Sequence, residues 1–251
     1  MTAEPFRSQL AALEQRGRLR RLSPRAGRDF ASNDYLGLAG DPMIAQAVAD
    51  AVARGVPLGS GGSRLLRGNA PEHEGLEAKA ADFFRTQASL FLANGYVANL
   101  TLLSALPQRG DLIVADELVH ASVHDGIRMS KASAVFARHN DVQSFADLIA
   151  AFRAEGGKGR VWIAVETLYS MDGDMAPLAD LAKLAARHEA MLLLDEAHGT
   201  GVFGPSGRGL SAGLDGLHNV VTLHTCGKAM GAEGALICGP RILIDYLVNR
   251  A

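Results

Sequence analysis

The sequence is poor in cysteine: its 251 residues include only Cys226 and Cys238, which form neither a disulfide framework nor a pattern of metal ligands. No apolar stretch reaches the roughly 20 residues that a bilayer-spanning helix needs. The first residues, Met1 to Glu4, do not have the pattern of a secretory signal. These absences argue against a disulfide-stapled, metal-binding, secreted or membrane protein. We therefore expect a cytoplasmic one.

An excess of positive charge is also absent, because 25 lysines and arginines stand against 27 aspartates and glutamates, for a formal net charge of -2. The single arginine cluster, Arg16–Arg21, is short. This balance does not favour binding to a phosphate backbone, so nucleic acid is not expected as a partner. Since 48% of the residues are hydrophobic, the chain can bury a large core.

What the sequence does contain is a regular alternation of short apolar runs with helical patterns. Helices are predicted over residues 6–15, after Asp41-Pro42, and over 72–86, 97–103 and 241–250. Strands are predicted over residues 88–92, 112–115, 134–136, 161–165, 191–194, 220–223 and 235–238. Continuous apolar strands with helices between them predict an α/β fold, in which a mostly parallel sheet is covered on both faces. Residues 199–216 are rich in glycine and predict a long loop.

Reactive side chains follow several of these strands. Lys228 lies between two predicted strands, while Asp195 and His198 follow the strand 191–194. A lysine that can form a Schiff base and an acid that can pair with a pyridinium nitrogen are what a pyridoxal phosphate site requires. Ligands of such sheets bind at the carboxyl ends of the strands, where these residues fall. The alternative is a buried structural lysine paired with a carboxylate.

A phosphate group would find an anion site in the segment Asn94-Gly95-Tyr96. This segment follows a predicted strand and precedes the helix 97–103, so its free backbone N–H groups and the helix dipole can hold a dianion. Gly95 permits close approach of the ligand. Thr225, three residues before Lys228, could offer its hydroxyl to the same phosphate or cap the end of the strand.

Three short patterns that suggest other functions lack their structural context. Asp195-Glu196-Ala197-His198 resembles a helicase box, but no phosphate-binding loop precedes it. Residues 199–204 match a dinucleotide fingerprint, yet Pro205 and further glycines follow where a helix must begin. Residues 209–213 match the nucleophile elbow of serine hydrolases without the strand that the elbow needs.

Taken in order, blocks of the chain resemble the α-oxoamine synthases, a family of fold-type-I pyridoxal-phosphate-dependent enzymes related to the class II aminotransferases. Within the family they are most similar to the branch that makes 8-amino-7-oxononanoate in biotin biosynthesis. The blocks that carry the resemblance are Ser32–Leu38, Gly59–Arg64, His73 with Leu76-Glu77, Asn94–Asn99, Asp116 with His120–Ser122, His139–Asp141, Ser170–Asp174, Asp195–Gly199, and Thr225 with Lys228.

The resemblance assigns roles to individual residues. It implies that Lys228 carries the cofactor as a Schiff base and then acts as the base, with Asp195 and His120 as further catalytic groups. It implies cofactor contacts for Gly95, Tyr96, His120, Ser170, Asp195, His198, Thr225 and Lys228, with His120 stacked on the ring and His198 at its phenolic oxygen. Substrate contacts are expected from Arg20, Asn33 and His120, where Arg20 suits a carboxylate because guanidinium binds one bidentately. His73 and His139 are expected to fix loops and helix ends.

The implied reaction is a decarboxylative condensation of L-alanine with pimeloyl-CoA or a pimeloyl carrier protein, giving 8-amino-7-oxononanoate, CoA or the free carrier, and CO2. One alternative is another α-oxoamine synthase, of the 2-amino-3-ketobutyrate CoA ligase, 5-aminolevulinate synthase or serine palmitoyltransferase type. A second, from a different class, is a non-catalytic fragment that binds pyridoxal phosphate or pairs subunits.

The resemblance also sets expectations for organisation. Residues 1–40 are predicted to form an N-terminal helical and extended arm, and residues 41–251 the large cofactor-binding domain of fold-type-I transferases. The C-terminal small domain of the family is expected to be absent. A homodimer is expected, because in the family each active site lies at a subunit interface.

Overall fold

The structure is a computed structural model that describes residues 3–250. Contacts divide the chain into two units, Met1–Ser32 and Asn33–Ala251, which we describe separately. The first unit contains helix α1 (Glu4–Gln15), none of whose described residues is buried, followed by a segment without regular structure. Arg20 lies in this segment and is exposed.

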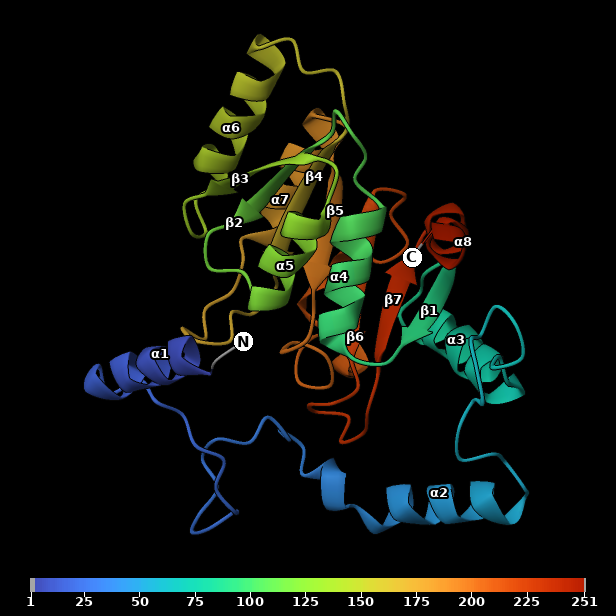
Figure 1. The fold of residues 1–251 in the computed structure, drawn as a ribbon. Coiled ribbons are helices and arrows are strands. Elements are labelled where there is room, and N and C mark those ends of the chain that lie inside the picture. Colours follow the sequence, from blue (N-terminus) through green and yellow to red (C-terminus); the bar gives the residue numbers. More distant parts are fainter. Residues whose placement is uncertain (1–2, 251) are drawn as a thin grey trace. The chain divides into compact units, whose positions relative to one another are not determined.

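The second unit is built on a sheet of seven strands in the order β1-β7-β6-β5-β4-β2-β3 (Figure 1). Strands β2 to β6 are parallel to one another, while β7 runs antiparallel to both β6 and β1. The mostly parallel sheet predicted from the sequence is therefore confirmed. The strands are β1 (Ala88–Leu92), β2 (Leu112–Asp116), β3 (Ser133–Ala137), β4 (Val161–Glu166), β5 (Met191–Asp195), β6 (Val220–Thr225) and β7 (Ala235–Gly239).

Helices cover both faces of the sheet, as expected. Figure 1 shows α4 (Gly95–Ala105) and α5 (Ala121–Met129) in front of the strands and α7 (Leu178–Arg187) behind them. The first face packs side chains such as Leu102, Trp162 and Leu247 of α8 (Arg241–Arg250) into one cluster. The second face packs Phe145 of α6 (Val142–Ala154) and Leu184 of α7 into another. Each fully buried side chain of this kind contributes about 1.5–3 kcal/mol.

Two helices precede the sheet in the chain. In α2 (Pro42–Ala53) the Asp41 carboxylate accepts the backbone N–H of Met43 at 2.7 Å, as the sequence predicts. Helix α3 (Pro71–Phe83) ends earlier than predicted, because Arg85 takes the left-handed conformation with φ of 51°. The loop predicted over 199–216 contains only short 3-10 turns, Pro205–Gly207 and Leu210–Leu214; a third, Leu38–Gly40, precedes α2.

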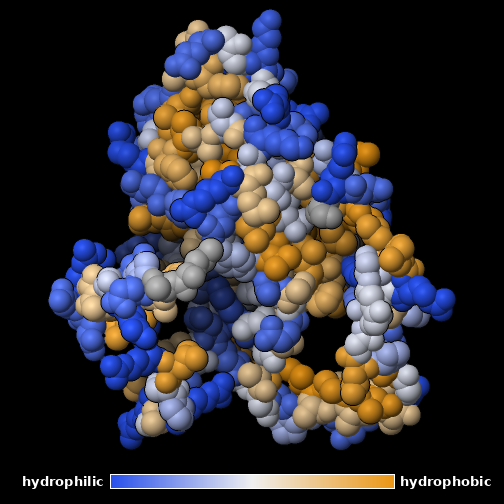
Figure 2. Space-filling model, viewed as in Figure 1, coloured by the Kyte–Doolittle hydropathy of each residue, from blue (hydrophilic) through white to orange (hydrophobic). Residues whose placement is uncertain are grey.

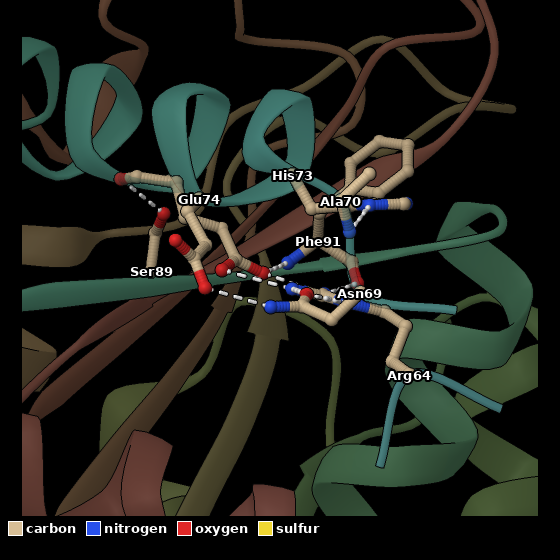
Figure 3. Close-up of polar contacts among 8 residues, drawn as sticks. Arg64, Asn69, Ala70, His73, Glu74, Ser89 and Phe91 are labelled. Atoms are coloured by element: carbon tan, nitrogen blue, oxygen red, sulfur yellow. Dashed lines mark hydrogen bonds and ion pairs between the residues drawn. The ribbon is translucent and has the colours of Figure 1, made fainter. Parts of the chain in front are cut away.

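Arg64 ties the glycine-rich block before α3 to the sheet (Figure 3). Its guanidinium donates to both oxygens of the Glu77 carboxylate, at 2.7 and 3.1 Å, and to Asn69 Oδ1 and the carbonyl of Phe91. His73 Nδ1 accepts the backbone N–H of Ala70 at 3.1 Å and so fixes the start of α3, as expected of it. Two of the sequence blocks that carry the resemblance are thus linked by one ion pair.

Helix α2 presents apolar side chains to solvent. Met43, Val48 and Val52 are 73%, 58% and 48% exposed, and no residue of the helix, all of which is described, is buried. Figure 2 shows hydrophobic colour along this helix. Among residues 3–250, no helix has both the length and the apolar character to cross a membrane.

Candidate active site

A cavity of about 200 Å³ opens at the carboxyl ends of β4, β5 and β6, where the starts of α4 and α5 face the sheet. Ligands of open α/β sheets bind at this edge. The cavity is lined by Gly95, Tyr96, Asn99, His120, Ser122, Glu166, Asp195, Ala197, His198, Leu223, Thr225 and Lys228. Seven of the eight cofactor-binding residues predicted from the sequence are therefore brought together.

Lys228 lies in the connection between β6 and β7. Two backbone hydrogen bonds close this connection, from Cys226 N–H to the Gly234 carbonyl and from Ala232 N–H to the Cys226 carbonyl, both at 2.9 Å. Burial lowers the pKa of Lys228, and the charges of Asp195 and Glu166 oppose this effect. A larger fraction of the side chain is therefore the free, nucleophilic amine than in an exposed lysine.

His198 is the polar partner of this amine. Its Nε2 lies 2.5 Å from Lys228 Nζ, and its Nδ1 lies 2.6 Å from the hydroxyl of Tyr35. Burial, with the nearby charge of Lys228, lowers the pKa of His198 to about 4, although Asp195 opposes the shift. The imidazole is consequently neutral at pH 7, with one nitrogen that donates and one that accepts.

Asp195 ends β5 and is held in a fixed direction. Its Oδ2 accepts a hydrogen bond from the Asn99 side chain at 2.7 Å, and its Oδ1 accepts the backbone N–H of Ala197 at 2.9 Å. Asn99 also donates to the hydroxyl of Ser122 at 3.0 Å, so α4 and α5 both support the carboxylate. Asp195 is only 7% exposed, and it can act as a preoriented anion at the cavity wall.

The start of α4 forms an anion cradle. The helix begins at Gly95, two residues earlier than predicted, and Asn94 Oδ1 accepts the Val97 N–H at 2.9 Å. A methyl group added at Gly95 would lie 3.5 Å from Thr225 Oγ1, which shows how closely the backbone and this hydroxyl face each other. The free amides of the first turn and the hydroxyl can donate hydrogen bonds to a phosphate, and the helix dipole favours its negative charge.

His120 caps α5 at the other side of the cavity. Its Nδ1 accepts the backbone N–H of Ser122 at 3.2 Å, which fixes the ring plane. The ring of Tyr96 lies perpendicular to it at 6.4 Å, and the Tyr96 hydroxyl donates to Asp125. The face of the imidazole is thereby available to a planar ligand.

Four polar residues of the site were not assigned by the sequence analysis: Tyr35, Asn99, Ser122 and Glu166. Glu166, the last residue of β4, is 3% exposed, and its Oε1 has no hydrogen-bond partner among the described residues. Burial, and then the charge of Asp195, raises the pKa of Glu166 to about 7, against the influence of Lys228 and the backbone N–H groups of His120 and Ser170. Extending the predicted strand 161–165 by one residue, to its first polar side chain, would have identified Glu166.

The remaining predicted residues lie outside the cavity lining. Ser170 is exposed in the loop after β4, and its backbone N–H faces Glu166. Asn33 is exposed, and its Oδ1 accepts a hydrogen bond from the Tyr35 hydroxyl at 3.0 Å. Tyr35 in turn contacts His198, so it links Asn33 to the cavity. Arg20 belongs to the separate N-terminal unit, and its assignment stays a prediction.

His139, which we expected to fix loops, links two carboxylates of the second unit. Its Nδ1 lies 2.8 Å from Asp116 Oδ1 and its Nε2 lies 2.7 Å from Asp174 Oδ2. Burial lowers the pKa of His139, but the two hydrogen bonds and charges outweigh it and the net shift is upward. In the part of the chain that is described, no group of three or more metal-ligating side chains could hold an ion.

The family described as aminotransferase class I and II matches residues 27–251. The 8-amino-7-oxononanoate synthase of Anaeromyxobacter sp. strain Fw109-5 is 45% identical over 258 residues, covering 97% of this chain and 64% of the relative. A serine palmitoyltransferase from S. paucimobilis with bound PLP superimposes with a TM-score of 0.87 at 26% identity, over 99% of this chain and 66% of that one.

The 8-amino-7-oxononanoate synthase from Francisella tularensis superimposes with a TM-score of 0.73 at 28% identity, over 88% of this chain and 61% of that one. These likenesses confirm the fold class predicted from the sequence, the large domain of fold-type-I transferases. The chain spans about 64% of the length of the curated relatives that it matches.

Proposed function

We propose, because this chain belongs to the aminotransferase class I and II family, that its cavity binds pyridoxal phosphate on Lys228 and serves an α-oxoamine synthase reaction. The observation that carries the proposal is the arrangement of Lys228, Asp195 and the start of α4 around one cavity. The finer proposal is the decarboxylative condensation of L-alanine with pimeloyl-CoA or a pimeloyl carrier protein. Its products would be 8-amino-7-oxononanoate, CO2 and CoA or the free carrier.

The residues present fit this cofactor. The phosphate would lie at the free amides of Gly95 and Tyr96 and at the Thr225 hydroxyl, the pyridine nitrogen at Asp195, and the aldehyde at Lys228. His120 would cover one face of the ring. His198 and the Ser170 loop would contact its oxygen side. Each of these groups offers the charge or donor that the corresponding part of the cofactor needs.

When bound, pyridoxal phosphate supplies an electron sink that stabilises negative charge at the α-carbon of an amino acid. The protein supplies the proton transfers and the orientation. Lys228, whose lowered pKa leaves more of its amine unprotonated, is the base within reach of the α-proton. Asp195, fixed by Asn99, keeps the nearby nitrogen in its charged form, and Asn33 and Arg20 would bind the carboxylates of the two substrates.

The choice of substrates rests on sequence similarity. Identity is 45% to the Anaeromyxobacter 8-amino-7-oxononanoate synthase, against 26% to the S. paucimobilis serine palmitoyltransferase, which favours L-alanine and a pimeloyl thioester. The TM-score of this serine palmitoyltransferase, 0.87, exceeds the 0.73 of the Francisella 8-amino-7-oxononanoate synthase, which favours serine and a palmitoyl thioester as the second candidate. A fragment that binds the cofactor without catalysis is the third.

One experiment separates these candidates. Purified protein is mixed with pyridoxal phosphate, reduced with borohydride and digested for peptide mapping, and we expect the adduct on Lys228. An adduct on Lys79, Lys131, Lys158 or Lys183 would refute the site. L-Alanine or L-serine is then added with pimeloyl-CoA or palmitoyl-CoA, and release of free CoA is followed. If the cofactor is bound to Lys228 but neither pair of substrates releases CoA, the result would support the non-catalytic fragment.

We also propose that two copies of the chain associate. The exposed apolar side chains of α2 support this, because a partner that covers them would remove their apolar surface from water. Association of two copies would also fit a site completed by residues of both.

A further inference from the structure

A line of hydrogen bonds leads from Lys228 to the exposed segment before α2. Lys228 Nζ lies 2.5 Å from His198 Nε2, His198 Nδ1 lies 2.6 Å from the Tyr35 hydroxyl, and that hydroxyl lies 3.0 Å from Asn33 Oδ1. The four groups are joined without a gap. Tyr35 and Asn33 belong to the same contact unit as the cavity.

The direction of each hydrogen bond follows from counting protons. Asn33 Oδ1 can only accept, so Tyr35 donates its single hydroxyl proton there. Burial raises the pKa of Tyr35, which keeps that proton in place. The Tyr35 oxygen must then accept from His198, and a neutral imidazole has only one N–H to give, at Nδ1. His198 Nε2 is left as an acceptor, and Lys228 is its donor.

The segment that carries Tyr35 is held against the lysine turn. Gly231, three residues after Lys228, packs so tightly on this segment that an added methyl group would lie 2.4 Å from the carbonyl carbon of Leu38. Asp34 accepts the backbone N–H groups of Leu38 and Ala39 at 2.8 and 3.2 Å. The backbone on either side of Tyr35 is thus held in place, while its hydroxyl is held by His198 and Asn33.

We propose that Tyr35 is a positioning residue: by donating to Asn33 and accepting from Nδ1 of His198, it makes Nε2 the acceptor and favours Lys228 as a hydrogen-bond donor. If Asn33 Oδ1 were taken by another donor, Tyr35 could turn its proton to His198. Nε2 would then carry the proton and would favour the free amine of Lys228. Coupling of this relay to a bound substrate rests on the proposed function, whereas the tautomer of His198 does not.

Other charged groups also act on Lys228 and His198. They are the same whether Nδ1 or Nε2 of His198 carries the proton. Asp195 at the end of β5 and Glu166 at the end of β4 act on Lys228, and His120 at the start of α5 acts on His198. None of them contacts Tyr35 through a hydrogen bond in the described residues, so in the chain without cofactor or substrate the variants of Tyr35 and Asn33 leave these charged groups in place.

The test uses the full chain without cofactor. Nitrogen-15 NMR of the histidine rings, with His198 assigned from the loss of its signals in His198→Gln, reports which ring nitrogen carries the proton. We expect Nδ1–H in the unmodified chain. Asn33→Leu, which removes the acceptor of the tyrosine proton, should convert His198 to Nε2–H although Tyr35 is still present. Asn33→Asp, which keeps an acceptor, should retain Nδ1–H, and Tyr35→Phe should remove the preference.

The second readout is the amine itself. The rate of acetylation of Lys228 is followed against pH by peptide mass spectrometry, and its midpoint should fall by about one unit in Asn33→Leu, since a hydrogen bond to a charged donor is lost. Tyr246→Phe, which removes a hydroxyl on α8 outside the cavity lining, should change neither the tautomer nor the midpoint.

Nε2–H in the unmodified chain, or an unchanged tautomer in Asn33→Leu, would overturn the proposal. Both measurements are made without cofactor, so a chain that fails to bind pyridoxal phosphate but shows Nδ1–H would refute the proposed function and leave the relay standing. A chain that binds pyridoxal phosphate on Lys228 but shows Nε2–H would refute the relay and leave the proposed function standing.

Discussion

Two buried carboxyl groups stand side by side at the cavity and differ in their partners. Glu166 and Asp195 are paired in register at the ends of β4 and β5. Asp195 accepts hydrogen bonds from Asn99 and Ala197, whereas Glu166 keeps an oxygen without a partner among the described residues. Burial and the charge of Asp195 raise the pKa of Glu166 to about 7, so this carboxyl group keeps its proton to a higher pH than an exposed glutamate does.

This difference predicts a pH-dependent stability. Because the folded pKa of Glu166, about 7, exceeds the unfolded value of 4.5, the folded protein holds a proton that the unfolded chain has lost, so stability falls as pH rises between these values. Relative to Glu166→Gln, we expect the unmodified chain to lose up to about 3 kcal/mol between pH 4.5 and 7, with no further loss above that. Urea unfolding across this range measures it.

Glu155→Gln, at an exposed position after α6, is the control and should show no pH-dependent difference from the unmodified chain. A constant difference for Glu166→Gln across the range would mean that Glu166 is already ionised at low pH.

Asp195 leads to a prediction about chemistry. Asp195→Ala removes the carboxyl group that we propose to face the pyridine nitrogen, so we expect the cofactor still to bind while exchange of the α-proton of L-alanine in deuterated water slows by at least about 10²-fold. Proton NMR of the alanine signal measures the exchange. Asp180→Asn, on the exposed face of α7, should leave it unchanged. Equal exchange rates for Asp195→Ala and the unmodified chain would assign the role to another acid.

The sequence predicted Asp195 directly after an apolar strand and Lys228 in the connection between two strands, but it missed Glu166 at the end of a third. It also missed residues whose role depends on a partner far along the chain. Asn99 looks like any polar residue of a helix until folding brings it 2.7 Å from Asp195, 96 residues away. Tyr35 likewise gains its role from His198, 163 residues away.

At the scale of elements, the glycine-rich segment before α3 depends on one side chain. Arg64 and Glu77 are 29% and 17% exposed, and the guanidinium bonds both carboxylate oxygens. Arg64→Ala should lower the free energy of unfolding by about 1–3 kcal/mol, because it leaves a partly buried carboxylate unpaired. Cleavage within residues 59–69 by a protease should become faster in the same variant.

Arg64→Lys keeps the positive charge but cannot donate to both oxygens of the carboxylate in the way that a guanidinium does. It should therefore recover less than half of the free energy of unfolding that Arg64→Ala loses. Lys183→Ala, which breaks an exposed pair on α7, should cost at most about 0.5 kcal/mol and serves as control. If Arg64→Ala matched this control, the segment would be held by its backbone alone.

Strands were predicted well, and their ends were not. Six of the seven extend beyond the predicted range, and the added residues at the carboxyl ends include Asp116, Glu166, Asp195 and Thr225. Counting apolar residues stops at the first polar side chain, although the backbone ladder continues through it. The added residues at the carboxyl ends of β4, β5 and β6 include Glu166, Asp195 and Thr225, which line the cavity.

At the scale of the whole molecule, α2 predicts self-association. A double substitution, Val48→Glu with Val52→Glu, places two charges on exposed apolar positions one turn apart. We expect the unmodified chain to sediment as a dimer and this variant as a monomer, because burying charge at an interface is unfavourable. Analytical ultracentrifugation with the cofactor present measures the change.

The control carries the same charge on α6, as Ala150→Glu with Ala154→Glu at exposed positions, and should remain a dimer. A monomeric unmodified chain, or a variant of α2 that still dimerises, would exclude this helix as the interface.

Two parts of the cavity wall come from segments that are far apart in the sequence. The anion cradle at Gly95 follows β1, whereas Thr225 and Lys228 belong to β6 and its connection to β7. Strand β1 pairs in the sheet only with β7, and more than half of the chain lies between them. During synthesis, therefore, β1 leaves the ribosome early but has no neighbour until β7 emerges. A growing chain cannot assemble the cradle around a cofactor, and capture must wait until the last strand of the sheet is in place.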